Sequence, residues 1–288
     1  MTVYLNGQFV AEEQAVVSVF DRGFQYGDGL FETMRVLRGR PFRWAQHWER
    51  LERGATFLRI PLPLESDALS ALAEELIAAN RLPDSLLRLA VSRGAGRPGY
   101  SPQGAVQPTI VMSCHPAPAI DPQRPPQWRL VVASLRLPAN EALAQFKTAN
   151  KLPQVLARAE ADAALAEEAL LQNTDGYLVE GASSNFFWIE QDTVCTPPLA
   201  SGILAGVTRA VVLEICRDLR LPMREANIPP NHLRQAQGAF VSLSSFGIVE
   251  AVALDGKPLN QSPWVARIRA AYESLLERES RNGAVGAK

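Results

Sequence analysis

Polar and apolar residues alternate along several short stretches of the chain, with the period of two that is typical of β-strands. In FETMRV, residues 31–36, the even-numbered side chains face one way and the odd-numbered ones the other. The Arg38-Gly39 pair then predicts a turn back into PFRW. Near the N-terminus, Asn6-Gly7 lies inside VYLNGQFV, and Asn-Gly is a strong signal for the tight turn of a β-hairpin.

Other stretches have the spacing of amphipathic helices. Trp48, Leu51, Ala55 and Leu58 recur at helical intervals in AQHWERLERGATFLRI. A second helix is expected over SDALSALAEELIAANRL, with Ser66 or Asp67 as its N-cap. Two further strands, LLRLAVSRG and PTIVMSC, complete a mixed α and β region.

A proline-rich segment divides the chain. HPAPAIDPQRPPQ, residues 115–127, holds five prolines, which disfavour helix and remove backbone donors. We therefore expect an N-terminal domain over residues 1–115, a linker over 116–128 and a C-terminal domain over 129–288. In the C-terminal part we expect a strand over 128–137, a helix over 152–167, strands over 168–198, a helix over 206–221, strands over 237–259 and a terminal helix. The fold class is α+β.

Composition and charge exclude several classes of protein. The chain is 47% apolar and 20% charged with a formal net charge of −1, so it lacks the basic surface typical of nucleic-acid or anionic-membrane binding. No stretch is apolar enough to span a membrane, and the N-terminus is unlike a signal peptide. Three widely spaced cysteines and three histidines form no zinc-type pattern, so we expect no metal site. A cytoplasmic protein with reduced thiols is expected.

Lysine is rare, which draws attention to each one. The sequence has four lysines (Lys147, Lys151, Lys257 and Lys288) against 25 arginines. A lysine amine can lose its proton and attack a carbonyl, whereas arginine stays charged. Lys147 is flanked by Phe146, Thr148 and Ala149, and apolar surroundings lower the pKa of a lysine. An ordinary solvated lysine is the competing interpretation.

Four further features could carry chemistry, and each has an ordinary structural alternative. Glu180 ends an apolar strand and could pair with a buried cation, or be a surface carboxylate. The expected helix start at Val207-Thr208 could bind phosphate, or simply be capped. The remaining candidates are a serine pair at a strand end and a helix arginine: Ser244, Ser245 and Arg50. Together with Lys147, they form the set that pyridoxal phosphate requires: an amine for its aldehyde, a carboxylate for its ring nitrogen and groups for its phosphate.

Six stretches occur in the order and at the separations of a known family: FDRGFQYGDGLFETMRV, HWERLERG, FKTANKLPQVLARAEA, GYLVEGASSNFFW, TPPLASGILAGVTR and AFVSLSSFGIV. From about residue 3 to residue 255, the chain resembles the class IV aminotransferases, the fold-type IV pyridoxal-phosphate enzymes. The resemblance implies a homodimer whose subunit has a small N-terminal α/β domain and a larger C-terminal domain with a mixed, pseudo-barrel sheet.

The resemblance also implies a role for each matching residue. Lys147 would form the Schiff base with pyridoxal 5'-phosphate, and Glu180 would pair with the ring nitrogen. Leu204 would pack against the ring face. The phosphate would be held by a set of side chains and backbone groups: Arg50, Val207, Thr208, Ser244 and Ser245.

The family includes branched-chain aminotransferases, D-amino-acid aminotransferases and 4-amino-4-deoxychorismate lyases. The segment VSRGAGRPGYSP is most similar to the lyases, although Arg97 lies one place earlier than in their usual pattern. Phe31 replaces the tyrosine of the D-amino-acid enzymes, and Asn150-Lys151 replaces the Asn-Tyr of the branched-chain enzymes. With Phe31 and Arg97 as substrate-binding residues, the resemblance implies a lyase that forms 4-aminobenzoate and pyruvate for folate biosynthesis. The second hypothesis is a transaminase, which would act on D-amino acids or, as a weaker alternative, on branched-chain amino acids. The third hypothesis is a non-catalytic protein that keeps the fold.

Overall fold

The computed structural model describes residues 1–282, so Lys288 lies outside the described part. The described chain groups into two compact units. Unit 1 contains Met1–Pro118, Phe146–Lys151 and the described residues from Leu276 onward, and unit 2 contains Ala119–Gln145 and Leu152–Leu275. The six residues around Lys147 therefore group with the N-terminal part of the chain. The sequence-based domain boundaries stay a prediction.

Unit 1 is built on a six-stranded antiparallel sheet in the order β2-β1-β6-β5-β3-β4. Its strands are β1 (Thr2–Leu5), β2 (Gln8–Ala11), β3 (Gly29–Leu37), β4 (Arg40–Pro41), β5 (Ser85–Ser92) and β6 (Thr109–Pro116). Its helices are α1 (Arg22–Tyr26), α2 (Trp44–Leu58) and α3 (Ser66–Asn80), with a 3₁₀ turn over Glu12–Gln14.

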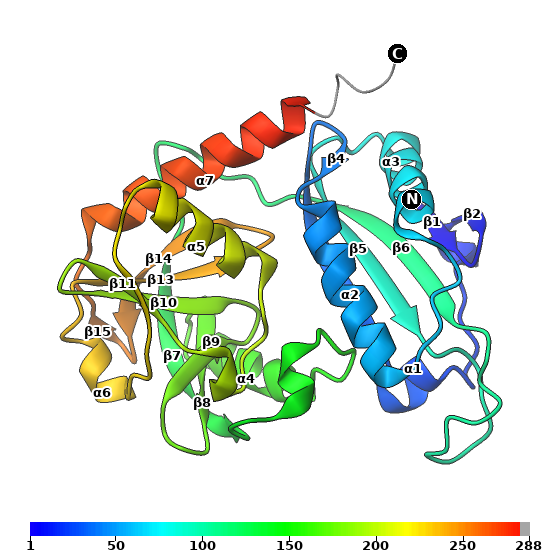
Figure 1. Cartoon of the computed structure of the whole chain (residues 1–288), viewed down its shortest axis with the longest axis horizontal. Coiled ribbons are helices and arrows are strands. Elements are labelled where there is room, and N and C mark those ends of the chain that lie inside the picture. Colours follow the sequence, from blue (N-terminus) through cyan, green and yellow to red (C-terminus); the bar gives the residue numbers. More distant parts are fainter. Residues whose placement is uncertain (283–288) are drawn as a thin grey trace. The chain divides into compact units, whose positions relative to one another are not determined.

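The core of unit 1 explains why α2 and α3 cover one face of this sheet (Figure 1). Alternate side chains of β3, such as Met34 and Val36, are fully buried and pack with Leu51 of α2 and Leu69 of α3. The intervening β3 side chains are only partly buried. The period-two pattern of residues 31–36 therefore forms the expected strand, with Phe31 and Glu32 on opposite faces.

Two expected hairpins are confirmed by their backbone angles. Asn6 and Gly7 have φ of 48° and 95°, and Arg38 and Gly39 have φ of 55° and 80°, as a type I′ turn requires. The expected N-cap of α3 is wrong: Glu65 occupies that position, without a side-chain capping bond. Ser66 instead accepts a hydrogen bond from the indole Nε1 of Trp44 at 3.1 Å.

Unit 2 is built on a nine-stranded mixed sheet. Its strands are β7 (Gln127–Leu137), β8 (Glu168–Asn173), β9 (Leu178–Gly181), β10 (Asn185–Glu190), β11 (Thr193–Thr196), β12 (Met223–Glu225), β13 (Gly238–Leu243), β14 (Gly247–Leu254) and β15 (Lys257–Pro258). Its helices are α4 (Leu152–Ala163), α5 (Val207–Asp218), α6 (Pro230–Leu233) and the larger part of α7 (Pro263–Asn282), with 3₁₀ turns over Ala142–Gln145 and Leu199–Ser201.

The sheet of unit 2 closes on itself. Six strands follow one another in the order β10-β13-β14-β7-β8-β9, and β9 pairs back with β10 through Glu180 and Asn185. The β7–β8 and β7–β14 pairs are parallel, and the other pairs of the ring are antiparallel. The expected mixed, pseudo-barrel sheet is therefore confirmed. The pairing of β9 with β10 places Glu180 in a closed part of the sheet.

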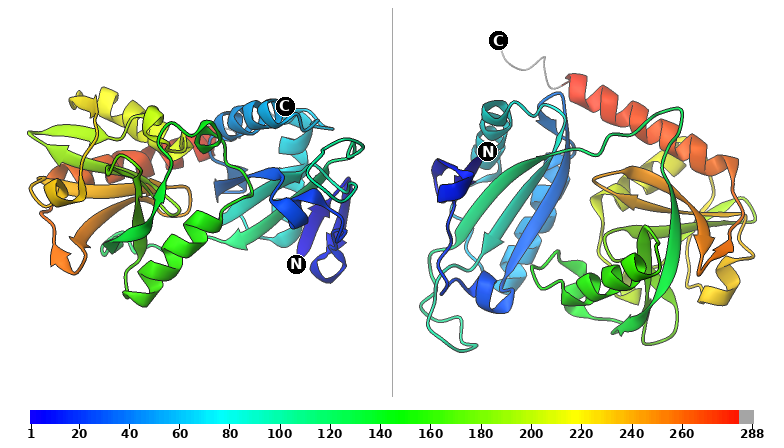
Figure 2. Two further views of the ribbon diagram at one scale, coloured as in Figure 1. Left: turned by 90° about the horizontal axis from the view of Figure 1, so that it is seen from below. Right: turned by 180° about the vertical axis from the view of Figure 1, so that it is seen from behind.

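Helix α4 packs against β7 and β8 of this sheet (Figure 2). It ends at Ala163, four residues before the expected end at 167. Leu165 has φ of 55°, a left-handed conformation that stops the helix. Among residues 1–282, no helix combines the length and the apolar character needed to cross a bilayer.

Candidate functional site

Lys147 is positioned by main-chain pairing with β3 in unit 1. The Phe31 N–H donates to the Lys147 carbonyl at 3.0 Å, and the Ala149 N–H donates to the Gly29 carbonyl at 2.8 Å. An isolated antiparallel bridge joins Leu30 to Thr148 between these two bonds. Residues 147–149 thus extend the sheet beside the start of β3, which fixes the backbone from which the lysine side chain projects.

The Lys147 side chain lies near an aromatic ring and a second cation. Its Nζ is 4.8 Å from the centroid of the Phe31 ring, and the guanidinium carbon of Arg88 is 4.0 Å from the same centroid. Phe31 and Arg88 come from the adjacent strands β3 and β5. Partial burial lowers the pKa of Arg88. Within residues 1–282, the Arg88 side chain makes no hydrogen bond or ion pair.

Arg50 lies in a buried cluster on the other face of β3. Its Nε donates to Glu32 Oε1 at 2.8 Å and its Nη2 donates to Glu32 Oε2 at 2.5 Å. The Nδ1 of His47, one turn earlier on α2, lies 2.6 Å from the same Oε2. All three side chains are buried, and Glu32 has no exposed surface. Glu32 therefore fixes the orientation of Arg50 through two of the five donors of its guanidinium.

These contacts determine the charge of the cluster. Burial alone would raise the pKa of Glu32, but Arg50 and the hydrogen bond from His47 lower it to about 2. Burial lowers the pKa of His47, since it outweighs the opposing effect of Glu32, and the charges of Arg50 and Lys147 lower it further. Near neutral pH the cluster is thus a carboxylate, an arginine cation and a neutral imidazole.

Arg97 lies in the exposed loop between β5 and β6 of unit 1. Unit 1 therefore contains four of the sequence-predicted site residues: Phe31, Arg50, Arg97 and Lys147. Unit 1 brings Phe31 and Lys147 into contact. Arg50 is bound to Glu32, and the Glu32 side chain lies on the opposite face of β3 from that of Phe31.

Glu180 lies on β9 in unit 2, with 9% of its surface exposed. Its Oε2 accepts a hydrogen bond from the Leu204 N–H at 2.9 Å. The Leu204 carbonyl in turn accepts a bond from Nδ2 of Asn185 at 2.9 Å. Because Asn185 pairs with Glu180 across β9 and β10, the two neighbours hold the Leu204 backbone from both sides. The structure thus brings the predicted Glu180 and Leu204 together.

Helix α5 begins three residues after Leu204. Gly206 is its N-cap, and Val207 and Thr208 are buried at its start. A Cβ on Gly206 would lie 1.8 Å from the Asn185 Oδ1, so this position has room only for glycine. Glycine lets the chain approach Asn185 closely at the start of the helix. The first N–H groups of a helix have no carbonyl partner within the helix, so they can bind a ligand such as phosphate. A carboxylate beside this helix start fits the ring nitrogen and phosphate of pyridoxal phosphate.

Ser244 and Ser245 lie in the turn between β13 and β14, as expected, and both are partly buried. A second buried carboxylate supports the β9–β10 turn: Oε2 of Glu168 accepts bonds from the hydroxyl groups of Ser183 and Ser184 at 2.8 Å and 3.0 Å. Glu168 thereby holds the turn that follows Glu180.

Several residues of these clusters were not identified as functional candidates from the sequence. Glu32 could have been found, because it is an acidic residue on the apolar face of an alternating strand. Asn185 and Arg88 carry no such local signal, because their partners come from distant segments.

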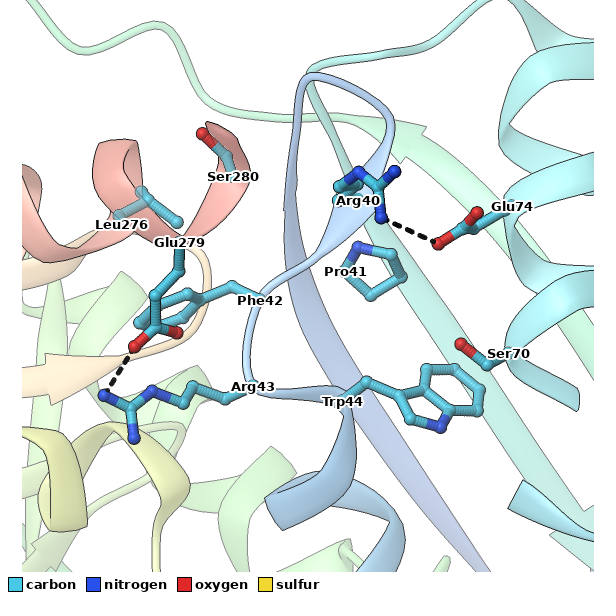
Figure 3. A pocket seen from close by; sticks show the side chains of 10 residues that line it. All are labelled: Arg40, Pro41, Phe42, Arg43, Trp44, Ser70, Glu74, Leu276, Glu279 and Ser280. Atoms are coloured by element: carbon cyan, nitrogen blue, oxygen red, sulfur yellow. Dashed lines mark ion pairs between the residues drawn. The ribbon is translucent and has the colours of Figure 1, made fainter. Parts of the chain in front are cut away.

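Two cavities of unit 1 are lined by other residues. One of about 190 Å³ contains the ion pairs Arg43–Glu279, at 2.8 Å, and Arg40–Glu74, at 3.7 Å (Figure 3). The other, of about 810 Å³, is lined largely by apolar side chains such as Val16, Val17 and Leu72. No predicted site residue lines either cavity.

Comparisons with known proteins identify the family. The model of the family described as amino-transferase class IV matches residues 29–254. A Methanocaldococcus jannaschii protein provisionally named a branched-chain-amino-acid aminotransferase is 35% identical over 263 residues, 90% of each chain. A D-alanine aminotransferase of Staphylococcus aureus is 30% identical over 284 residues, 96% of this chain and 99% of the other.

Solved structures of members of this family are similar to the chain over nearly its whole length. The 4-amino-4-deoxychorismate lyase of Pseudomonas aeruginosa has a TM-score of 0.82 and 33% identity, covering 96% of this chain and 98% of the other. The branched-chain amino acid aminotransferase of T.th. with pyridoxamine 5'-phosphate has a TM-score of 0.89 and 26% identity, covering 96% and 93%. The chain belongs to the class IV aminotransferase family. It has the fold-type IV architecture and is a pyridoxal-phosphate-dependent enzyme.

Proposed function

We propose that the protein is a 4-amino-4-deoxychorismate lyase, which releases pyruvate from its substrate and leaves 4-aminobenzoate. The observation that carries the proposal is the arrangement of two cations on one aromatic ring: Lys147 and Arg88 on Phe31. The substrate is a cyclic diene with two carboxylates and one amine. A guanidinium can bind a carboxylate with two parallel bonds, while a flat ring beside it favours a flat, partly conjugated substrate.

Two residues that the family resemblance places at the substrate, Phe31 and Arg97, support the same activity. Phe31 has no hydroxyl with which to bind the carboxylate of an amino acid, unlike the tyrosine of D-amino-acid aminotransferases. Arg97 supplies a further cation in the same unit, and a second carboxylate on the substrate would need one. The similarity to the Pseudomonas aeruginosa lyase extends over nearly the whole of both chains.

The roles of the residues follow from their chemistry. Pyridoxal phosphate, when bound, supplies a carbonyl that joins the substrate amine and a ring that withdraws electrons from the neighbouring carbon. Lys147 would hold the cofactor until the substrate amine replaces it, and its free Nζ would then take the proton from the carbon that bears that amine. The electron pair left behind would break the bond between the adjacent ring carbon and the enolpyruvyl oxygen. The departing enolpyruvate would take up a proton to become pyruvate, and the ring would become aromatic.

The residues of unit 2 would orient the cofactor and set its charge. Glu180 would keep a proton on the ring nitrogen, because a carboxylate held by the Leu204 N–H is a fixed acceptor. Leu204 would pack on the ring face. The N–H groups of Val207 and Thr208 and the hydroxyl groups of Ser244 and Ser245 would bind the phosphate. Arg50 of unit 1 would be a further phosphate ligand, as the family resemblance implies.

We also propose a cytoplasmic homodimer. Exposed apolar side chains of unit 1, which include Val16, Val19, Phe20 and Phe24, are 57–76% exposed and would be covered by a second copy. Cys114, Cys195 and Cys216 are free and buried, which suits a reducing compartment.

Product formation by Arg88 variants tests the proposal. With aminodeoxychorismate as substrate, Arg88→Gln should raise KM by at least about tenfold, since it removes a charged partner of a carboxylate. Arg129→Gln, which removes an exposed arginine of unit 2, is the matched control and should leave KM unchanged. Equal KM values for wild type and Arg88→Gln would remove the main support for the lyase.

A transaminase of D-amino acids is the second candidate, favoured by the 30% identity to the Staphylococcus aureus enzyme over nearly its whole length. It would use the same Lys147 but return the proton to the cofactor. This candidate is supported if the protein transfers an amino group from D-alanine to a keto acid and releases no 4-aminobenzoate from aminodeoxychorismate. If a branched-chain L-amino acid is the preferred donor, the protein is instead a branched-chain aminotransferase.

A further inference from the structure

The loop that carries Arg97 has little regular structure of its own. It connects β5 to β6, and residues 97–102, which we call the substrate loop, are neither helix nor strand. Tyr100 at its tip is 88% exposed. A loop this exposed would sample many conformations unless something outside it fixed its backbone.

Arg22 supplies that contact. It lies on α1 and only 4% of its surface is exposed. Its Nη1 donates to the carbonyl of Gly99 at 2.9 Å and to that of Ser101 at 3.2 Å, and its Nη2 donates to the Tyr100 carbonyl at 3.1 Å. One guanidinium therefore binds three consecutive carbonyl groups of the substrate loop.

The guanidinium is itself held from the other side. Its Nε donates to Oδ2 of Asp28 at 2.8 Å. The same carboxylate accepts bonds from Nε and Nη2 of Arg93 at 2.8 Å and 3.0 Å. Arg93 also donates to the carbonyls of Leu58 and Arg59 at the end of α2. The chain of contacts thus runs from the loop through Arg22 and Asp28 to the helix that carries Arg50.

Two further features fit the path of the Arg22 side chain. A Cβ on Gly96 would lie 3.0 Å from Cδ of Arg22 and 3.2 Å from Cβ of Ala105, so glycine leaves room for the arginine stem. The Tyr26 hydroxyl accepts a bond from the Gly99 N–H at 3.0 Å, and its ring centroid lies 4.9 Å from the Arg22 guanidinium carbon.

We propose that Arg22 is a positioning residue for substrate specificity, which holds the substrate loop in the one conformation that presents Arg97 to the substrate. This inference rests on the proposed role of Arg97. Arginine is needed because its planar fork can bind three carbonyls and a carboxylate at once, whereas a lysine ammonium is a compact charge with three donors. Gly99, where the fork first binds, is only two residues from Arg97.

The experiment compares Arg22→Gln, Arg22→Lys and Tyr26→Phe with wild type, all loaded with cofactor. Arg22→Gln leaves Asp28 paired with Arg93, so the partly buried carboxylate keeps a cation. Arg38→Gln removes an exposed arginine that pairs with Glu277 and serves as the control. Chymotrypsin cleavage after Tyr100, followed by mass spectrometry, reports loop opening without reference to activity, and steady-state kinetics report KM and kcat.

In Arg22→Gln we expect cleavage after Tyr100 to be faster by at least about tenfold and KM to rise by at least about tenfold, because three charged hydrogen bonds to the loop are lost. The kcat should stay within about threefold and the bound-cofactor absorbance should be unchanged. Arg22→Lys and Tyr26→Phe should give intermediate values, and they keep the test decisive if Arg22→Gln fails to fold.

Three results would overturn the inference: wild-type cleavage and KM in all three variants, faster cleavage with an unchanged KM, or equal effects in Arg38→Gln. If the wild-type enzyme shows no lyase activity, KM is measured with the amino acid that converts its cofactor, and the cleavage assay is unaffected. Failure of the lyase assignment and failure of the Arg22 proposal are thus separate outcomes.

Discussion

Replacing Glu32 with glutamine should destabilise the fold in a way that depends on pH. The carboxylate is completely buried and holds Arg50 by two hydrogen bonds, and His47 lies 2.6 Å away. Glutamine has nearly the same shape, so Glu32→Gln removes the charge while leaving the volume of the core unchanged. The buried arginine then loses its counter-charge, which is costly in a low-dielectric interior.

The size of the effect follows from the pKa. In the folded protein the pKa of Glu32 falls from 4.5 to about 2. A lowering of that size corresponds to about 3 kcal/mol of folding free energy at pH 7. Because the folded pKa is the lower one, this stabilisation is complete above pH 4.5 and is lost as the pH falls from 4.5 to about 2. At pH 3 only about 1 kcal/mol should remain.

Urea-induced unfolding of the wild type and Glu32→Gln, followed by circular dichroism, measures this difference. The control is Glu74→Gln, which removes an exposed carboxylate 3.7 Å from Arg40 and should cost at most about 0.5 kcal/mol. The reasoning is refuted if Glu32→Gln is no less stable than the control at pH 7. It is also refuted if the difference from wild type is the same at pH 7 and pH 3.

Three further substitutions test the candidate site. Lys147→Ala should lower product formation by at least about a thousandfold, while the control Lys257→Ala, which alters an exposed lysine, should not. Equal rates of product formation in the two variants would contradict the role of Lys147 as the base. Glu180→Gln keeps an acceptor for the Leu204 N–H but loses the charge, so the rate should fall by about a hundredfold with the cofactor still bound, measured by absorbance during turnover. Gly206→Ala should weaken pyridoxal-phosphate binding by at least about tenfold, because its Cβ would overlap the Asn185 Oδ1, and unchanged affinity in a fluorescence titration would refute this.

Local signals in the sequence were sufficient for most elements of the fold. The Asn6-Gly7 and Arg38-Gly39 turns depend only on backbone conformations that these residues adopt, and both formed as expected. The cap of α3 was missed because Ser66 bonds to the indole of Trp44, a tertiary contact that no local pattern reveals. The closed ring of unit 2 also depends on pairs between strands far apart in the sequence, such as β10–β13 and β7–β14, although the family resemblance implied a pseudo-barrel.

For the candidate site, the residue types were easier to predict than their contacts. Lys147 stood out because lysine is rare in this chain, and Glu180 because it ends an apolar strand. The bridge between Leu30 and Thr148, which brings Lys147 beside Phe31, joins segments far apart in the sequence. Glu32 was seen only as one position of an alternating strand, since its partners Arg50 and His47 lie on a separate helix.

The most direct test of the lyase assignment is to supply aminodeoxychorismate to the wild-type, cofactor-loaded protein without any keto acid, and to measure both products over many turnovers. The assignment predicts continuous release of pyruvate and 4-aminobenzoate in equal amounts. It is contradicted if neither product forms while D-alanine or another amino acid still converts the bound cofactor to its amine form.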